Sequence, residues 1–294
     1  MTMRSLVTML CLTGVAGAQD WTVPKEGVGA MLVLERSDRT YTLSPSDKPW
    51  KGATGRARVR LPLNRAERQG LEQGKELIET GKLDEAAAKI RALVVTNPAN
   101  YDAWHLRALL LHRQGKHEEA LAALRESLIG NRRNPEAWKL LEQVGKAAGR
   151  RVERPQFKLR AWMRKKGKGV EISNWQRDDW DFPWIYYGCA RAYFRYEGGF
   201  KRAFPKRAGY VFTFREQLFC LGAAMEGARM AMKEREKIPA DLKLLLDLEK
   251  KKTLVPFAFF AIHPDPVPRK PERGFDRLKP RLEAYFDRHI CPKR

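Results

Sequence analysis

The sequence predicts a mostly α-helical fold, with helical hairpin repeats at residues 64–150, an α-helical C-terminal domain after them, and a short β-containing segment before them. The first observation is a period, because Gly81, Gly115 and Gly149 lie 34 residues apart, which is a length typical of helical-hairpin repeats. The second is that apolar residues after residue 150 recur at helical spacing without that period. With 294 residues, of which 43% are hydrophobic, the chain is long enough for a sizeable core in one or two domains.

The first 18 residues have the pattern of a secretory signal peptide. Arg4 supplies a positive charge, residues 5–15 form a short apolar run, and the small residues at 16–18 precede an expected cleavage site before Gln19. The apolar run is shorter than the roughly 20 residues that a membrane-spanning helix needs. We therefore expect an exported protein, periplasmic or secreted, with no transmembrane segment after signal cleavage.

Export makes the cysteines relevant, because oxidising compartments allow disulfides to persist. Cleavage would leave Cys189, Cys220 and Cys291, an odd number that permits at most one internal bridge. Cys189 and Cys220 lie in helix-like apolar segments, and the sequence leaves open whether they are ordinary buried thiols or a disulfide.

Residues 19–63 form a segment of different character. Residues 30–34 and 40–43 are short strand-like runs separated by a turn at Ser37 and Asp38, and residues 56–63 alternate basic and apolar side chains. This pattern predicts a hairpin and a third strand. Three short strands bury little by themselves, so we expect the segment either to pack on the helical body or to act as a tether.

Small and bulky residues recur in register over residues 67–149. Gly74 corresponds to Ala108, Ala86 to Ala120, Ile90 to Leu124, and Trp104 to Trp138, and Pro98 closes the first hairpin. Small side chains at these positions let two antiparallel helices approach closely, while Leu and Ile fill the space around them. The pattern resembles the tetratricopeptide repeat, and this resemblance implies stacked helical hairpins that bind other proteins, not a reaction.

A third hairpin begins and then fails. Trp138, Leu141 and Gly149 are in phase, but Arg154 occupies the small-residue position and Pro155 falls inside the expected second helix. We therefore predict a lone final helix at residues 135–148. Because two repeats bury too little apolar surface by themselves, a later part of the chain must cover the open face.

The resemblance further implies that the first helix of each hairpin lines a concave groove that holds a protein or peptide partner. By that analogy the groove residues are Arg68, Leu71, Lys75, Glu79, Asp102, His105, Leu109, His112, Arg113, Glu136, Lys139 and Gln143. The set mixes charges of both signs, and it does not match the Lys/Asn pattern by which repeats of this family hold a peptide carboxylate.

No metal, cofactor or catalytic motif is predicted. His105 and His112 are seven residues apart, about two helical turns, which is too far for both to bind one metal ion, and His117 does not change that expectation. There is no Cys/His spacing of the kind that zinc requires, no phosphate loop, no dinucleotide fingerprint and no nucleophile motif.

The charge of the chain is strongly basic and uneven. The net charge is +22, and residues 151–294 contribute 33 Lys and Arg against 18 Asp and Glu, whereas residues 64–150 contribute 15 against 12. The excess is consistent with a solvated basic surface or with attraction to an anionic partner. The densest patch is the candidate contact with an anionic envelope surface, and its residues are Lys158, Arg160, Trp162, Arg164, Lys165, Lys166 and Lys168.

The basic C-terminal domain, residues 151–294, is expected to be helical. Residues 214–233 form the clearest helix, with a capping-box pattern at Thr213 and Glu216; residues 240–251 form a second, and residues 254–262 are helix or strand. A final helix includes Pro280. The aromatic residues at 174–188 are interpreted as core, with a sugar- or cation-binding surface as the alternative.

These features predict an exported, non-catalytic scaffold of tetratricopeptide-repeat type that binds a protein at the cell envelope. The first alternative is a hydrolase-like enzyme with its site between the repeats and the C-terminal domain, using Asp178, Asp179 or Asp181. The second is polyanion or nucleic-acid binding through the basic C-terminal face, although export disfavours nucleic acid.

Overall fold

The structure is a computed structural model that describes residues 63–166, 169–174, 181–196, 198–203, 205, 210, 212–232, 238–262 and 275–293. The expected signal peptide and all but the last residue of the β-containing N-terminal segment lie outside these residues. The described residues divide into a repeat domain, residues 63–156 with 275–293, and a second domain, residues 157–262. Each is described by itself.

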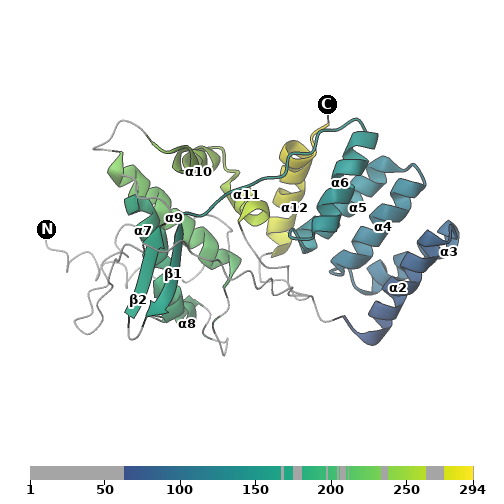
Figure 1. The fold of residues 1–294 in the computed structure, drawn as a ribbon, viewed down its shortest axis with the longest axis horizontal. Coiled ribbons are helices and arrows are strands. Elements are labelled where there is room, and N and C mark those ends of the chain that lie inside the picture. The colour runs from purple at the N-terminus through teal and green to yellow at the C-terminus, as the bar shows by residue number, and fades with distance from the viewer. Residues whose placement is uncertain are drawn as a thin grey trace, which may run out of the picture. The chain divides into compact units, whose positions relative to one another are not determined.

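The repeat domain contains the two predicted hairpins and the predicted lone helix. Its first five helices are α2 (Arg65–Glu79), α3 (Leu83–Thr96), α4 (Tyr101–Arg113), α5 (His117–Gly130) and α6 (Pro135–Ala147). Helices α2 and α3 form one hairpin and α4 and α5 the next, and the first helices α2, α4 and α6 are neighbours in the stack (Figure 1). The mostly helical fold with stacked repeats is confirmed.

Glycine and asparagine set the helix boundaries. Gly81, Gly115 and Gly149 follow the ends of α2, α4 and α6 with φ of 77°, 73° and 69°, a left-handed conformation that glycine adopts without steric cost. The side chains of Asn100 and Asn134 accept hydrogen bonds from backbone amides in the first turns of α4 and α6, and such caps satisfy amides that have no helical partner.

The small residues of the repeat pattern lie where helices come closest. Ala86, Ala108 and Ala120 are each 0% exposed. A Cβ atom on Gly74 would lie 3.2 Å from Cγ1 of Ile90, which is tighter than ordinary van der Waals contact. The close packing that the sequence pattern predicts is therefore present in both hairpins.

The two tryptophans of the pattern make the same hydrogen bond one repeat apart. The indole N–H of Trp104 donates to the carbonyl of Pro98 at 2.8 Å, and that of Trp138 donates to the carbonyl of Arg132 at 2.7 Å. Each bond ties the start of a first helix to the turn that precedes it.

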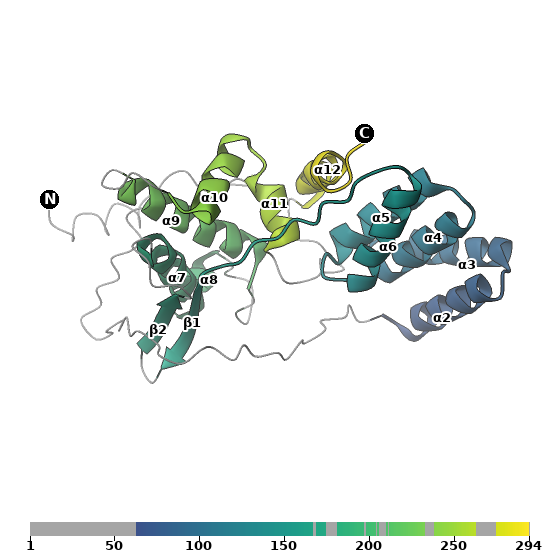
Figure 2. The same cartoon turned by 45° about the horizontal axis from the view of Figure 1, so that its top comes forward.

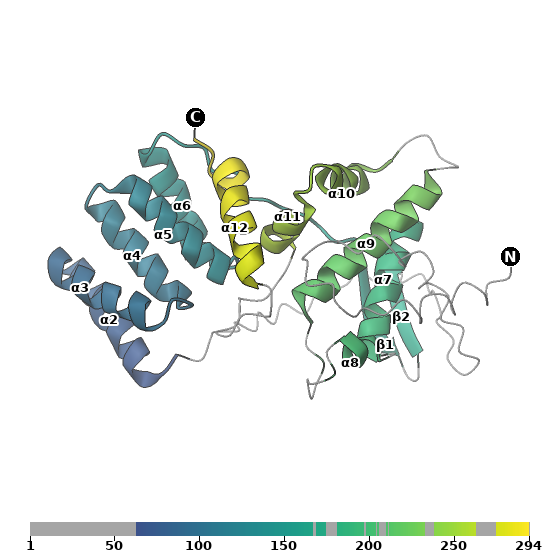
Figure 3. The same ribbon diagram turned by 180° about the vertical axis from the view of Figure 1, so that it is seen from behind.

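The last helix of the chain belongs to the repeat domain, and this differs from the expected single domain at residues 151–294. Helix α12 (Phe275–Tyr285) continues into a π-helical turn, η1 (Phe286–Ile290), and lies beside α5 (Figure 1, Figure 3). The physical reason is that residues 151–160 are not helical, so α6 has no partner from the adjacent sequence. The apolar side chains that α12 and η1 bury there are Leu278, Leu282, Phe286 and Ile290, each at most 1% exposed.

The second domain centres on a helix pair, α7 (Asp181–Tyr196) and α9 (Phe214–Ala231). A two-stranded antiparallel hairpin packs on α7 (Figure 2); its strands are β1 (Ala161–Lys166) and β2 (Gly169–Asn174), paired from Ala161 with Asn174 to Lys166 with Gly169. The short helices are α8 (Gly199–Ala203), α10 (Ala240–Lys250) and α11 (Leu254–Ala261).

The β-hairpin adds two strands to residues 151–294, which the sequence predicted as a helical domain. Met163 and Ile172 pack with Ala192 of α7 in one apolar cluster. The close approach depends on Gly188, because a Cβ atom there would lie 2.3 Å from Cγ2 of Ile172. The hairpin thus covers an apolar face of α7, and the sequence on either side of α7 does not predict this contact.

The aromatic segment before and within α7 is core where the structure describes it. Trp184 and Tyr187 are 0% exposed and Tyr186 is 8% exposed. Asp178 and Asp179 lie outside the described residues, and the side chain of Asp181 is likewise not described, so the structure does not test the carboxylates of the enzyme hypothesis.

Helix α9 begins as predicted, but its capping box is only half formed. The hydroxyl of Thr213 accepts a hydrogen bond from the amide of Glu216 at 3.1 Å, while the Glu216 carboxylate accepts from the Tyr210 hydroxyl at 2.7 Å. Residues 254–261 are helix and not strand. Cys189 and Cys220 are free thiols in the structure. Within the described residues no helix is long and apolar enough to cross a membrane.

Candidate functional site

The predicted groove residues lie on three neighbouring helices of the repeat domain. Helices α2, α4 and α6 carry them, and these helices are adjacent in the stack (Figure 1). Seven of the residues are exposed, namely Arg68, Lys75, Glu79, Arg113, Glu136, Lys139 and Gln143. The other five are half-buried, namely Leu71, Asp102, His105, Leu109 and His112. Each of the three helices therefore presents at least one exposed polar side chain.

Two leucines of the predicted set contribute to packing. Leu71 of α2 and Leu109 of α4 pack against the apolar cluster that contains Ile78 and Ile90. Their exposed fractions are intermediate, so each offers a partner some apolar surface while also stabilising its own hairpin. A substitution at either position would mix a binding effect with a folding effect.

Arg113 links the two hairpins. Its Nη1 donates a hydrogen bond to the carbonyl of Ile78 in the last turn of α2, where carbonyl groups lack an amide donor within the helix. The same carbonyl accepts from the Gly81 amide at 3.3 Å, so the guanidinium adds a second hydrogen bond at the end of α2. Sequence reasoning had assigned Arg113 only to partner contact, and the structure adds a structural role.

His105 of α4 lies near Glu136 of α6. Burial lowers its pKa, and the Glu136 carboxylate of α6 partly opposes that shift. A half-buried imidazole with a lowered pKa is neutral at pH 7. His105 therefore contributes a neutral hydrogen-bonding group to the groove rather than a positive charge.

Helices α2 and α6, the outer two of the three, carry exposed polar side chains of the predicted groove set. On α2, Lys75 and Glu79 form an ion pair of 3.6 Å with side chains 65% and 59% exposed, and such a surface pair contributes little stability. On α6, Lys139 and Gln143 are exposed. These side chains are available to a partner at small cost to the fold.

The structure brings together two histidines that the sequence did not pair. His112, in the last turn of α4, and His117, the first residue of α5, have their Nδ1 atoms 3.2 Å apart. Burial and the nearby His117 both lower the pKa of His112. The sequence feature that could have predicted this pair is the spacing of five residues across Gly115, because Gly115 makes the turn that brings the two rings together.

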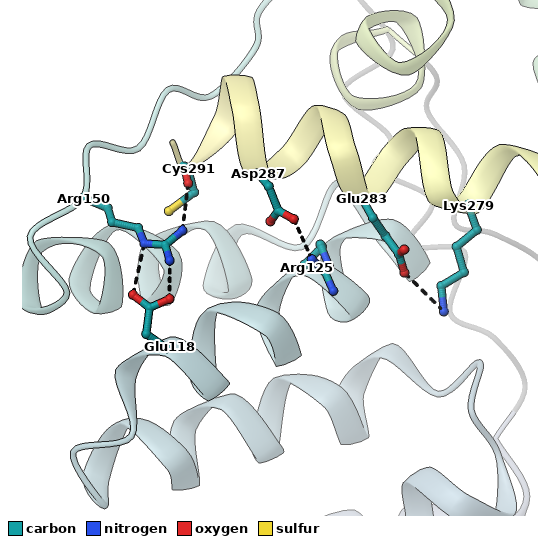
Figure 4. A network of polar contacts seen from close by, with 7 residues as sticks. All are labelled: Glu118, Arg125, Arg150, Lys279, Glu283, Asp287 and Cys291. Carbon is teal, nitrogen blue, oxygen red and sulfur yellow. Dashed lines mark hydrogen bonds and ion pairs between the residues drawn. The ribbon is translucent and has the colours of Figure 1, made fainter. Parts of the chain in front are cut away.

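A polar network fixes α12 and η1 on α5 (Figure 4). Arg150, whose side chain is 8% exposed, pairs with Glu118 at the start of α5, and its Nη1 donates to the carbonyl of Cys291 at 3.2 Å. Arg125 pairs with Asp287 at 2.8 Å, and Lys279 pairs with Glu126 at 2.8 Å. Since the start of α5 meets the end of η1, the two elements run antiparallel.

An open cavity of about 560 Å³ lies beside this network. Its lining comes from α5, the residue Arg150 and the end of the chain, and it includes Phe286, Arg288 and Lys293. None of the predicted groove residues lines it. The cavity is therefore separate from the groove and carries no part of the predicted site.

The candidate anionic-surface residues are only partly described. Arg160 forms an ion pair with Asp241, with Nε to Oδ2 at 2.7 Å and side chains 19% and 18% exposed. It is thus engaged inside the second domain, which corrects its assignment as an open surface cation. Lys158 is exposed. Trp162, Arg164, Lys165 and Lys166 lie in β1, their side chains are not described, and Lys168 falls outside the described residues.

The stacked α-hairpins define a helical-repeat architecture. Residues 71–139 match the model of the tetratricopeptide repeat family, which confirms that this stretch is a tetratricopeptide-repeat segment. A search of curated proteins and a search of solved structures gave no match.

Proposed function

We propose that this protein is an exported, non-catalytic scaffold that binds a protein or peptide at the cell envelope, in the groove formed by α2, α4 and α6. The observation that carries the proposal is the tetratricopeptide-repeat segment at residues 71–139, since such repeats generally bind proteins or peptides along their concave face. Export rests on the signal-peptide pattern of residues 1–18.

The groove chemistry favours a partner segment with both charged and apolar side chains. Arg68, Lys139 and Glu136 offer exposed charges of both signs, and Leu71 and Leu109 offer partly exposed apolar surface between them. A mixed row of this kind selects a partner by its pattern of charges. It does not provide a cluster of cations for a single terminal carboxylate.

The test is capture of partners from the native envelope fraction by the mature protein, at moderate and at high salt. A groove variant combines Arg68→Ala, Lys139→Ala and Gln143→Ala, all at exposed positions. A matched control combines Lys89→Ala, Arg91→Ala and Thr96→Ala on α3, which are exposed on the second helix of a hairpin.

We expect the groove variant to lose a partner that the wild type and the control variant both retain at high salt. All three proteins should melt at the same temperature, because exposed substitutions of this kind change stability by no more than about 0.5 kcal/mol each. Equal capture by the groove variant and the control would contradict binding through the groove.

Polyanion binding by the second domain is a second candidate, and one observation favours it. Arg195 lies over the rings of Tyr196 and Tyr210 at 5.4 and 5.5 Å, and Arg202 lies over Tyr193 at 5.8 Å. Both arginines are exposed and form no ion pair with any other residue in the described part of the chain. Aromatic rings that hold guanidinium groups in place offer a polyanion fixed cations.

The measurement for this candidate is retention on immobilised heparin across a salt gradient. Arg195→Gln with Arg202→Gln should elute at lower salt than the wild type, whereas the α3 control variant should lose less of its retention. If both variants shift equally in elution, retention on heparin depends on net charge and not on these two arginines in particular.

A further inference from the structure

His112 and His117 form a pair of imidazoles at the turn between α4 and α5. Their Nδ1 atoms are 3.2 Å apart, their ring centroids are 5.1 Å apart, and the ring planes are inclined by 50°. Both side chains are half-buried, so each is partly accessible to solvent. His112 belongs to the predicted groove set and His117 does not, and the pairing of the two rings does not require a bound partner.

The separation of the two nitrogens matches that of two ligands on one metal ion. Zinc–imidazole bonds of about 2.0–2.1 Å in tetrahedral geometry place two ligand nitrogens about 3.3–3.4 Å apart. The observed 3.2 Å falls within about 0.2 Å of that value. We infer that His112 and His117 bind one divalent transition-metal ion through their Nδ1 atoms, at the edge of the second repeat.

The backbone holds both rings in place before any ion binds. Gly115 has φ of 73°, and the turn around it is closed by hydrogen bonds from the Gly115 amide to the His112 carbonyl at 3.0 Å and from the Lys116 amide to the Leu111 carbonyl at 2.9 Å. Ligands on helix ends joined by a fixed turn lose little conformational freedom on binding. A site of two ligands benefits most from this arrangement, because it has few bonds with which to offset that loss.

The protonation state also suits a metal ligand. Metal binding requires neutral imidazole, and burial together with the neighbouring His117 lowers the pKa of His112. Without metal, the Nδ1–H of one ring donates a hydrogen bond to Nδ1 of the other. When the ion binds, the donor ring takes its other neutral tautomer, with the proton on Nε2, so that both Nδ1 lone pairs are free for the ion.

The number of protein ligands limits the ion and its affinity. In the part of the chain that the structure describes, no three His, Cys, Asp or Glu side chains are grouped to hold a metal, so water completes the coordination of the proposed ion. Imidazole suits zinc, nickel and copper, and divalent affinities rise toward copper. We expect Cu²⁺ to bind more tightly than Ni²⁺ or Zn²⁺.

The test is titration of the mature full chain with CuCl₂ and with ZnCl₂ at pH 7, followed by calorimetry and, for copper, by electron paramagnetic resonance. His112→Gln and His117→Gln each remove one ligand. His105→Gln is the matched control, because His105 lies on the same helix but seven residues from His112.

The wild type should bind one ion whose copper spectrum reports two nitrogen ligands. Loss of a direct ligand should weaken binding at least as much as the roughly 10- to 100-fold that loss of a supporting partner causes. His105→Gln should bind as the wild type does. Two results would overturn the inference: equal weakening in all three variants, or unchanged affinity in both His112→Gln and His117→Gln. If His112→Gln lowers the melting temperature of the metal-free protein, the metal affinity of His117→Gln, at the start of α5, tests the inference by itself.

Discussion

Leu282→Ala is the sharpest test of whether the end of the chain completes the repeat domain. Leu282 lies in α12, is 0% exposed, and belongs to the apolar row that faces the repeat domain. Replacing a fully buried Leu by Ala costs about 2–5 kcal/mol, from lost burial and the cavity that remains. For a domain of roughly 100 residues, each kcal/mol lowers the melting temperature by about 4 °C or more. We therefore expect a decrease of at least about 8 °C in the melting of the repeat domain.

Hydrogen exchange measured by mass spectrometry on the full chain reports where the stability is lost. In Leu282→Ala, amides of α5 should exchange faster, because α12 lies beside α5 and local opening exposes its hydrogen bonds. Amides of α7 and α9 should exchange as in the wild type. The experiment therefore separates the two domains without dividing the chain.

Two controls define the refuting result. Val95→Ala removes a side chain that is 73% exposed on α3 of the same domain, and it should change stability by no more than about 0.5 kcal/mol. Leu245→Ala removes a fully buried leucine from α10 of the second domain, and it should leave α5 protected. If Leu282→Ala leaves α5 protected and instead affects α7 and α9, then α12 does not complete the repeats.

Three further outcomes are expected. Gly188→Ala should destabilise the second domain by about 1–3 kcal/mol in urea unfolding, because its new Cβ would lie 2.3 Å from Cγ2 of Ile172. Adding Ile172→Ala should recover part of that stability. A double variant no more stable than Gly188→Ala would argue against this contact. Arg150→Ala should cost the repeat domain about 1–3 kcal/mol and speed exchange in η1, because the bond to the Cys291 carbonyl is lost; unchanged exchange there would show that the network is not needed. Burial raises the pKa of Glu216 to about 7 from its ordinary 4.5, while the hydrogen bond from the Tyr210 hydroxyl and the charge of Arg191 oppose the shift. The stabilisation from the protonated carboxyl is therefore complete below about pH 4.5 and lost as the pH rises through about 7. The melting temperature of Glu216→Gln relative to wild type should rise over this pH range, and a difference that stays constant would refute the raised pKa.

The repeat pattern was sufficient to predict most of the repeat domain. The positions of Gly81 and Gly115, the close packing at Gly74 and Ala108, and the lone final helix at residues 135–148 all agree with the structure. These features are local and periodic, because a helix is specified by residues three and four positions apart. The polar capping by Asn100 and Asn134 follows the same 34-residue spacing.

The helices that carry the predicted groove residues follow from the repeat pattern, and the groove itself stays a prediction. The sequence placed the groove residues on the first helices of the hairpins, where the structure has them. It did not indicate that Arg113 binds the Ile78 carbonyl, or that His112 meets His117. These contacts depend on side-chain directions across a turn or between hairpins, which a periodicity does not contain.

The sequence alone determined the helical repeats, the helix boundaries at glycine and the basic character of the chain, since each depends on composition or on short-range spacing. Only the tertiary structure decided that α12 completes the repeat domain more than 120 residues after the failed third hairpin, and that a β-hairpin covers α7. Both outcomes depend on which apolar faces are left uncovered once the local helices have formed. That is a property of three-dimensional complementarity between distant segments, and no local pattern in the chain specifies it.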